Sequence, residues 1–443
     1  MTPIPTVLEA SKTPRLNAPT VHRLPDGLTI VAEQVPVEAV NLSLWLGVGS
    51  AVESDAINGM AHFLEHMVFK GTNRLQSGEF ERLVEQRGAV TNAATSQDYT
   101  HYYITTAPQD FASLAPHQIE VVLNAAIPDE AFERERHVIL EEIRRASDSP
   151  QRRTFYRAME MSFERSPYRR PVLGPTSVIE SLTAQQMRDF HQTWYQPQSM
   201  TAVAVGNLPV EQLIEIVADG FAQSRAQRPA PLTTALPKPP LAELEPQFPT
   251  IQRYEQTDPT LQQARLVMTW RVPGMDSLSQ TYALDVLASV LAQGRTSRLV
   301  RDLREDRRLV SGISASNMTY THQGVFYISA QLPAENLAAV EQAIAHHIRR
   351  LHSEPVTEFE IQRIRTLVAN RFVFGNETPG DRAGLYGYYH SIVGDLQPAM
   401  LYPTHIQSVE AADLTAAAQR YLSPDAYGVV ILKPEACPPT PDP

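Results

Sequence analysis

Residues 59–71 read GMAHFLEHMVFKG, and both the fold and the chemistry expected of the chain are worked out from this stretch. Apolar side chains stand at positions 60, 63, 64 and 67, which is the spacing of one helix face. Gly59 and Gly71 can mark the two ends. We therefore expect a helix whose apolar face is anchored in a core.

The other face of this helix has the spacing of a metal site. Residues four apart lie on the same side of a helix, so His62 and His66 can direct both imidazoles at one zinc ion. Glu65 lies on that side too and can accept a proton from water without being a ligand. The chain has 13 histidines, so a chance pair is not rare, but the intervening Glu favours zinc, and His-x-x-Glu-His is the inverzincin signature. Catalytic zinc sites have three protein ligands, so a third is required.

The third ligand is predicted in a downstream helix rich in Glu and Arg. Its helical phase puts Glu142 on the inward side with Ile139, and Glu141 on the charged side with Arg145. Glu135 lies seven residues before Glu142 on the same face and is expected to orient a ligand. Taken alone, such a helix is more often a solvated one with internal ion pairs. Together with the histidine motif, Glu142 is favoured as the ligand.

The composition excludes several classes of protein. The chain has 443 residues, and its net charge of −11 argues against non-specific nucleic-acid binding and weakly favours basic partners. Cys437 is the single cysteine, which excludes an intrachain disulfide and a Cys-based zinc site. No apolar run approaches membrane-spanning length, and residues 1–17 lack a signal pattern. We expect a soluble cytoplasmic protein. The sequence has no nucleophile elbow and no phosphate-binding loop of the Walker type.

The chain is predicted to contain two homologous α+β domains. A Pro-rich stretch over 229–249 is interpreted as a linker between a domain over 1–228 and a domain over 250–443. A shift of 227 residues aligns apolar, aromatic and Pro positions of the two halves, which indicates duplication: Ile179 with Ile406, Trp194 with Tyr421, Pro197 with Pro424, and Val203 with Val430. With a small change of offset, the three motif positions fall on Asp285, Ala288 and Ser289, so the second half lacks the zinc motif.

With these residues the sequence resembles the pitrilysin or insulinase family of zinc peptidases, most of all the short-chain branch of mitochondrial and bacterial processing peptidases. The resemblance covers about residues 21–434 and implies two homologous domains, each a mainly antiparallel sheet packed with helices, that form half of a clamshell. The matching segments are His62 to Thr72, Glu142 at 76 residues after His66, Asn92 to Thr95, Asp98 to Thr100, and Arg382 to Tyr389.

The resemblance implies a zinc metalloendopeptidase with one zinc ion per chain, held by His62, His66 and Glu142. Glu65 takes the proton of the attacking water. Tyr389, helped by Arg382, stabilises the oxyanion. In the short-chain branch this Arg/Tyr pair comes from a second subunit; because this chain carries both halves of the machinery, a homodimer completed in trans is expected, and a heterodimer stays possible.

Substrate binding is predicted at the segment Asn92, Ala93 and Ala94. It reads as an edge strand with small side chains, where an extended, unfolded peptide can add by backbone hydrogen bonds. An ordinary edge strand has the same pattern. A different class also stays open, that of a non-catalytic structural subunit of a processing-peptidase-like or respiratory complex, although such a subunit has no need of Glu65.

Overall fold

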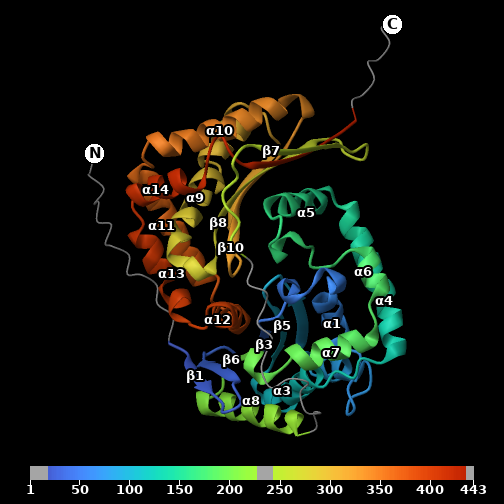
Figure 1. The fold of residues 1–443 in the computed structure, drawn as a ribbon. Coiled ribbons are helices and arrows are strands. Elements are labelled where there is room, and N and C mark those ends of the chain that lie inside the picture. Colours follow the sequence, from blue (N-terminus) through green and yellow to red (C-terminus); the bar gives the residue numbers. More distant parts are fainter. Residues whose placement is uncertain (1–17, 227–242, 436–443) are drawn as a thin grey trace, which may run out of the picture.

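The computed structural model describes residues 18–226 and 243–435, which form two α+β domains of the same design (Figure 1). The first segment forms β1 (Thr20–Arg23), β2 (Thr29–Gln34), β3 (Val40–Leu46), α1 (Met60–Val68), α2 (Glu79–Glu85), β4 (Val90–Thr95), β5 (Thr100–Thr106), α3 (Pro108–Leu123), α4 (Asp129–Asp148), α5 (Pro150–Ser162), α6 (Thr176–Ser181), α7 (Ala184–Trp194), β6 (Met200–Gly206) and α8 (Val210–Arg225). The second forms β7 (Gln252–Thr257), β8 (Ala264–Pro273), α9 (Tyr282–Ala292), β9 (Gly312–Met318), β10 (Gln323–Leu332), α10 (Leu337–Ser353), α11 (Glu358–Phe374), α12 (Pro379–Val393), α13 (Gln397–Ser408), α14 (Ala411–Tyr421) and β11 (Gly428–Lys433). The predicted Pro-rich linker lies outside the described residues up to position 242.

The two sheets repeat one strand order. It is β1-β2-β6-β3-β5-β4 in the first and β7-β11-β8-β10-β9 in the second, so the orders agree strand for strand once β1 is set aside. In each sheet one pair is parallel, β2 with β6 and β7 with β11, and the other pairs are antiparallel. The prediction of two homologous α+β domains with mainly antiparallel sheets is confirmed. In this correspondence α1 matches α9, and α5 matches α12.

The two halves exchange one helix with each other. Helix α5 follows α4 in the chain but packs on β8 and β11 of the second sheet, where Ala158 contacts Val267 and Val430. Its counterpart α12 packs on β3 and β6 of the first sheet (Figure 1). There Gly387 meets the ring of Trp45 so closely that an added Cβ would lie 2.0 Å from the indole Nε1. Strands β3 and β6 are therefore buried along their whole length.

Buried polar contacts also join the halves. Arg382 of α12 forms an ion pair with Glu33 of β2, and the Tyr386 hydroxyl donates to the other carboxylate oxygen at 2.8 Å. At the β4–β5 turn, the carboxylate of Asp98 accepts hydrogen bonds from Thr321 N and the Tyr168 hydroxyl, both at 2.9 Å. Buried polar groups are costly unless they are paired, so these contacts fix how the halves meet.

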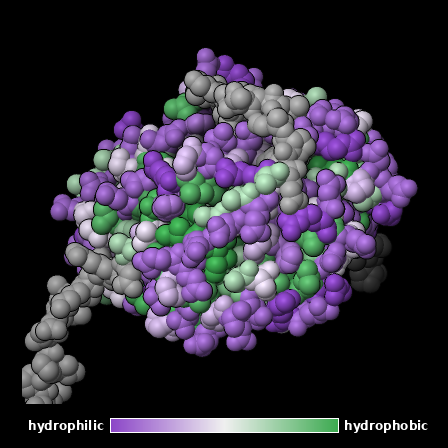
Figure 2. Space-filling model, turned by 90° about the horizontal axis from the view of Figure 1, so that it is seen from below, coloured by the Kyte–Doolittle hydropathy of each residue, from purple (hydrophilic) through white to green (hydrophobic). Residues whose placement is uncertain are grey.

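Within 18–226 and 243–435, no helix is both long and apolar enough to cross a bilayer. On the face at the bottom of Figure 1, hydrophilic residues predominate and the hydrophobic ones gather in patches between them (Figure 2).

Candidate metal centre

Helix α1 carries the histidine motif and is held by its apolar face. Met60, Phe63, Leu64 and Met67 are all fully buried in the core of the first domain. Gly59 precedes the helix with a φ of 99°, and an added Cβ would lie 2.7 Å from both the Leu173 carbonyl oxygen and the Ile179 side chain. The helix ends at Val68, three residues before the predicted end. His62 and Glu65, on the opposite face of the helix, line a cavity.

A buried carboxylate caps the start of α1. Glu53 is only 1% exposed, and it accepts hydrogen bonds from Gly59 N at 2.8 Å, Asn58 Nδ2 at 2.9 Å and Ala61 N at 2.7 Å. Burial raises the pKa of the Glu53 carboxyl to about 7, against the effect of these hydrogen bonds. A carboxylate at a helix N-terminus compensates the helix dipole. Sequence analysis missed Glu53, because its only signal is an acidic residue a few positions before the helix.

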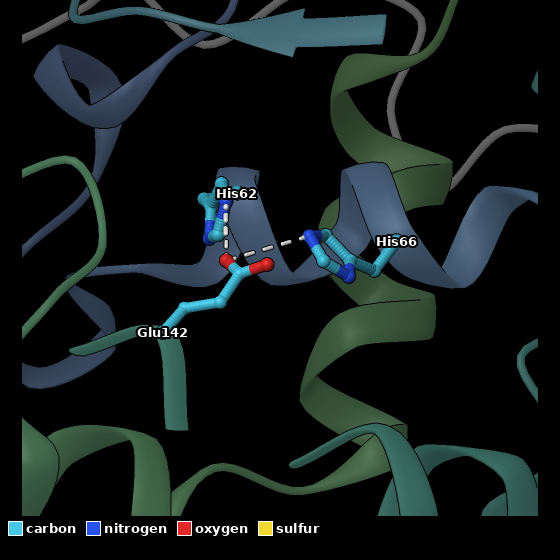
Figure 3. A group of neighbouring side chains, drawn as sticks. All are labelled: His62, His66 and Glu142. Atoms are coloured by element: carbon cyan, nitrogen blue, oxygen red, sulfur yellow. Dashed lines mark ion pairs between the residues drawn. The ribbon is translucent and has the colours of Figure 1, made fainter. Parts of the chain in front are cut away.

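Three side chains converge as metal ligands would. Glu142 Oε2 lies 3.5 Å from His62 Nε2 and 3.8 Å from His66 Nε2, and one donor atom of each residue lies within 4.8 Å of the other two. Figure 3 shows the Glu142 carboxylate between the two imidazoles. Donors around a tetrahedral zinc ion, with bonds of about 2.0–2.1 Å, are roughly 3.3 Å apart. The group therefore fits zinc with small closing movements, and it is the one such group in the described parts of the chain.

The protonation state of the imidazoles suits ligation. Burial, with the charge of His66 as a smaller cause, lowers the pKa of His62 to about 4, so this imidazole is neutral near pH 7. His66 Nδ1 lies 3.0 Å from Glu135 Oε1, and Lys70 Nζ lies 2.7 Å from Glu135 Oε2. Burial alone would raise the pKa of Glu135, but the bonds from Lys70 and His66 hold it below its ordinary value. An ionised Glu135 keeps the His66 proton on Nδ1 and leaves Nε2 free for a metal.

The two adjacent glutamates of α4 point to opposite sides. Glu142 faces α1, whereas Glu141 is bonded to Arg144 at 2.8 Å and to Arg145 at 3.1 Å on the exposed side. These arginines lower the pKa of the Glu141 carboxyl to about 2, the Arg144 hydrogen bond being the largest cause. Glu141 is thus a surface ion-pair partner, and Glu142 alone of the two lies near the histidines.

Glu65 lies beside the ligand group and not within it. Its Oε2 accepts a hydrogen bond of 2.5 Å from the Thr95 hydroxyl at the end of β4. Burial raises the pKa of Glu65; hydrogen bonding by Thr95 opposes this, and the charges of His66 and Glu142 act in opposite directions. Glu65 and His62 line a cavity of about 690 Å³, whose other walls include Ala94, Thr95, Phe155, Tyr156 and, from β10 of the second half, Tyr327.

The predicted peptide-binding segment lies on a free sheet edge. Within 18–226 and 243–435, strand β4 is the last of its sheet and pairs with β5 alone. Ala94 lines the same cavity of about 690 Å³ as His62 and Glu65, which we call the metal cavity. The Asn92 side chain accepts a hydrogen bond of 2.9 Å from Ala93 N. That bond shows that the Ala93 N–H points away from β5, toward the side where an added strand would pair.

The predicted Arg/Tyr pair lies elsewhere in the chain. Neither Arg382 nor Tyr389 lines the metal cavity. Arg382 is engaged by Glu33 and donates to the Asn376 carbonyl at 2.9 Å. Tyr389 lines a separate cavity of about 580 Å³ in the second half, and burial raises the pKa of its hydroxyl.

The cavity of the second half is the counterpart of the metal cavity. It is built on α9, the equivalent of α1, with Asp285 at the position that corresponds to His62. The Asp285 carboxylate accepts hydrogen bonds from Asn317 Nδ2 at 2.8 Å and from the Tyr402 hydroxyl at 3.1 Å. This half therefore uses protein hydrogen bonds where the first half presents the candidate ligand group.

Comparisons with known proteins match nearly the whole chain. Residues 29–176 match the family model "Insulinase (Peptidase family M16)", and residues 181–368 match "Peptidase M16 inactive domain". The zinc protease PqqE of Helicobacter pylori is 27% identical over 417 residues, which cover 93% of this chain and 92% of that relative. An uncharacterised zinc protease of Mycobacterium bovis is 28% identical over 429 residues, 94% of this chain and 93% of its own. The crystal structure of a protease from Helicobacter pylori superposes with a TM-score of 0.87 at 26% identity, covering 94% of this chain and 99% of that one.

Proposed function

The chain belongs to the insulinase (M16) family of zinc proteases, and we propose that it is itself a zinc metalloendopeptidase that hydrolyses unfolded peptides. The observation that carries the proposal is the convergence of His62, His66 and Glu142 with Glu65 beside them. A non-catalytic subunit would need neither a fitting ligand set nor a buried carboxylate in the adjoining cavity.

The proposed chemistry assigns one role to each group. His62, His66 and Glu142 would hold one zinc ion. When bound, zinc polarises the scissile carbonyl and lowers the pKa of a water molecule toward 7. Glu65 accepts the proton of the attacking water on the oxygen that Thr95 leaves free, and then donates it to the leaving nitrogen. Glu135 keeps His66 in the tautomer that presents Nε2.

Peptides are proposed to bind by adding a strand to β4. The free edge at Asn92, Ala93 and Ala94 runs toward Glu65 and the ligand group, so a peptide paired there passes the reacting groups. Backbone pairing reads little sequence, which suits unfolded substrates, and the net charge of −11 favours basic ones. A cytoplasmic location is part of this proposal.

The site is proposed to be completed by a second copy of the chain. Tyr389 from that copy would stabilise the oxyanion, a role worth about 3–4 kcal/mol for one donor. Arg382 would support it by fixing α12, the helix that carries Tyr389, through its contacts with Glu33 and Asn376. This proposal is supported by the placement of Tyr389 and the metal site in one chain: Tyr389 lines one cavity, and His62 and Glu65 line another. Two copies would then enclose a chamber with two sites; a heterodimer is the alternative.

The test of the proposed function is made on the purified chain. Zinc content and cleavage of a mixed set of unstructured peptides are measured for the wild type and for Glu65→Gln. We expect about one zinc per chain in both and a loss of about 10²–10⁴ in kcat in the variant. A wild type without zinc would refute the ligand assignment and favour the non-catalytic subunit, whereas zinc without cleavage would point to a missing partner.

The trans arrangement is tested by mixing two inactive variants. Glu65→Gln supplies an intact Tyr389, and Tyr389→Phe supplies an intact metal site. If sites form between copies, unfolding and refolding the two chains together restores roughly a quarter of wild-type activity, since half of randomly assembled dimers are mixed and each has one intact site. No recovery on mixing would argue against a homodimer completed in trans.

A further inference from the structure

We propose that Thr95 is a positioning residue for the general base, because its hydroxyl fixes the Glu65 carboxylate with one oxygen free toward the metal ligands. The inference rests on the proposed function and deepens it. It starts from a side-chain hydrogen bond that joins the peptide-binding edge of the sheet to the helix of the metal site, 2.5 Å between Thr95 Oγ1 and Glu65 Oε2.

The direction of this hydrogen bond follows from the neighbouring groups. The buried Thr100 hydroxyl lies 2.8 Å from the Val48 carbonyl oxygen, which can only accept, so Thr100 donates its proton there. Thr100 Oγ1 is 3.3 Å from Thr95 Oγ1, a longer contact. The proton of Thr95 is therefore directed at Glu65, and Glu65 Oε2 is occupied as an acceptor. Oε1 is the oxygen that the Thr95 hydroxyl leaves free to take a proton from water.

The position of Thr95 is set by the strand on which it lies. It is the last residue of β4 and pairs with Thr100 of β5. Its hydroxyl therefore holds the Glu65 carboxylate from the free edge of the sheet. A peptide that adds to β4 would extend along that same edge. Thr95 would thereby fix the position of the Glu65 carboxylate relative to the backbone of the bound peptide.

Few other contacts hold Glu65 in this orientation. Among the described residues its carboxylate has no ion pair, and it accepts a hydrogen bond from the Thr95 hydroxyl. Its side chain borders a cavity of about 690 Å³, so it has room to rotate when the hydroxyl is removed. Loss of the hydroxyl should therefore misplace the base without disturbing His62, His66 or Glu142.

The experiment compares Thr95→Val, which is nearly isosteric but has no hydroxyl, with Thr95→Ser, which keeps one. Thr105→Val is the matched control, because this hydroxyl on the adjacent strand accepts from Asn41 at 2.9 Å and does not contact Glu65. Each variant is crystallised without metal and with zinc, and zinc content, kcat and KM are measured. The crystal structures report on the Glu65 carboxylate independently of activity.

We expect Thr95→Val to rotate Glu65 in both crystals and to lower kcat about ten- to a hundredfold, the range for a hydrogen bond to a charged group. Zinc content should be unchanged, KM and the Thr105→Val control should stay within about threefold, and Thr95→Ser should recover most of kcat. An unmoved Glu65 in Thr95→Val, or equal losses in the Ser and Val variants, would overturn the proposal. An active Glu65→Gln would instead sink the proposed function, and the crystal positions would still decide whether Thr95 orients Glu65.

Discussion

Glu135 Oε1 lies 3.0 Å from His66 Nδ1, on the side of the imidazole that faces away from the ligand group. The same carboxylate is held from its other oxygen by Lys70 at 2.7 Å. Two successive contacts thus link Lys70, two residues past the end of α1, through Glu135 to His66, one of the candidate metal ligands. Partners of this kind fix the tautomer and raise the basicity of a ligand histidine.

Glu135→Gln should weaken zinc binding without removing it. The amide cannot carry the charge that keeps the His66 proton on Nδ1, and such changes cost about 10–100-fold in metal affinity or activity. Chelator competition measures the affinity. Glu130→Gln is the control, because it removes the same charge from the same helix at a side chain that is 93% exposed. Equal affinities in the two variants would contradict this role for Glu135.

Glu142→Gln and Glu141→Gln should differ sharply although the residues are adjacent. Glu142 is 3.5 Å from His62, whereas Glu141 is paired with Arg144 on the exposed side. We expect Glu142→Gln to lose more than about 100-fold in zinc affinity, beyond the effect of an outer partner. Glu141→Gln should keep zinc and activity. Metal analysis after dialysis decides between them, and zinc retained in Glu142→Gln would refute the ligand assignment.

Gly387→Ala should destabilise the protein, and Gly384→Ala should not. An added Cβ at 387 would lie 2.0 Å from the Trp45 ring, whereas the one at 384 meets nothing within 4 Å. Overpacking of this kind costs about 1–3 kcal/mol, while replacing an unobstructed helical Gly by Ala gains about 0.5–1 kcal/mol. Denaturant unfolding of both variants gives the two free energies. A stable Gly387→Ala would mean that α12 does not pack tightly on the first sheet.

Glu53 should make stability fall as the pH rises. Its pKa is raised by burial from 4.5 to about 7 in the folded chain, so the folded state binds the proton more tightly than the unfolded state. The resulting stabilisation is fully present below about pH 4.5 and is lost as the pH rises through about 7. The free energy of unfolding of the wild type relative to Glu53→Gln should therefore drop by up to about 3 kcal/mol between pH 4.5 and 8.

This Glu53 experiment compares two proteins that share all other titrating groups. A constant offset between them is expected from the altered helix cap and carries no information on the pKa. A difference that does not depend on pH would show that Glu53 titrates near its ordinary value in the folded protein.

Much of the candidate metal centre could be predicted because its geometry is local. Helical phase alone places His62, Glu65 and His66 on one face of α1, and it separates Glu142 from Glu141 on α4. The apolar positions of both helices predict that these faces turn toward each other. The repeat was predictable for a similar reason, since the segment around 179–203 and its counterpart keep their apolar, aromatic and Pro positions at a shift of 227 residues.

Contacts that depend on strand register or on distant chain segments could not be predicted. The bond from Thr95 to Glu65 requires that β4 ends beside α1, and no spacing in the sequence encodes this. Arg382 and Tyr389, seven apart on one helix, resembled a functional pair. Within one chain, Arg382 pairs with Glu33, 349 residues away. Tyr386, one helical turn after Arg382, donates a hydrogen bond to the same carboxylate. Amphipathic patterns show that a helix covers a sheet but not which of two similar sheets.

The exchange of α5 and α12 has a consequence for how the chain is made. During synthesis the first sheet is finished at Gly206, yet the helix that covers Val31, Trp45 and Val203 ends only at Val393. While nearly two hundred further residues are being translated, this apolar face of the first sheet would therefore stay exposed, because α12 does not yet exist. A chain stopped after residue 226 should bind hydrophobic dyes that the whole protein does not bind. Completion of the first half thus waits for translation of the second, so the two are obliged to mature together.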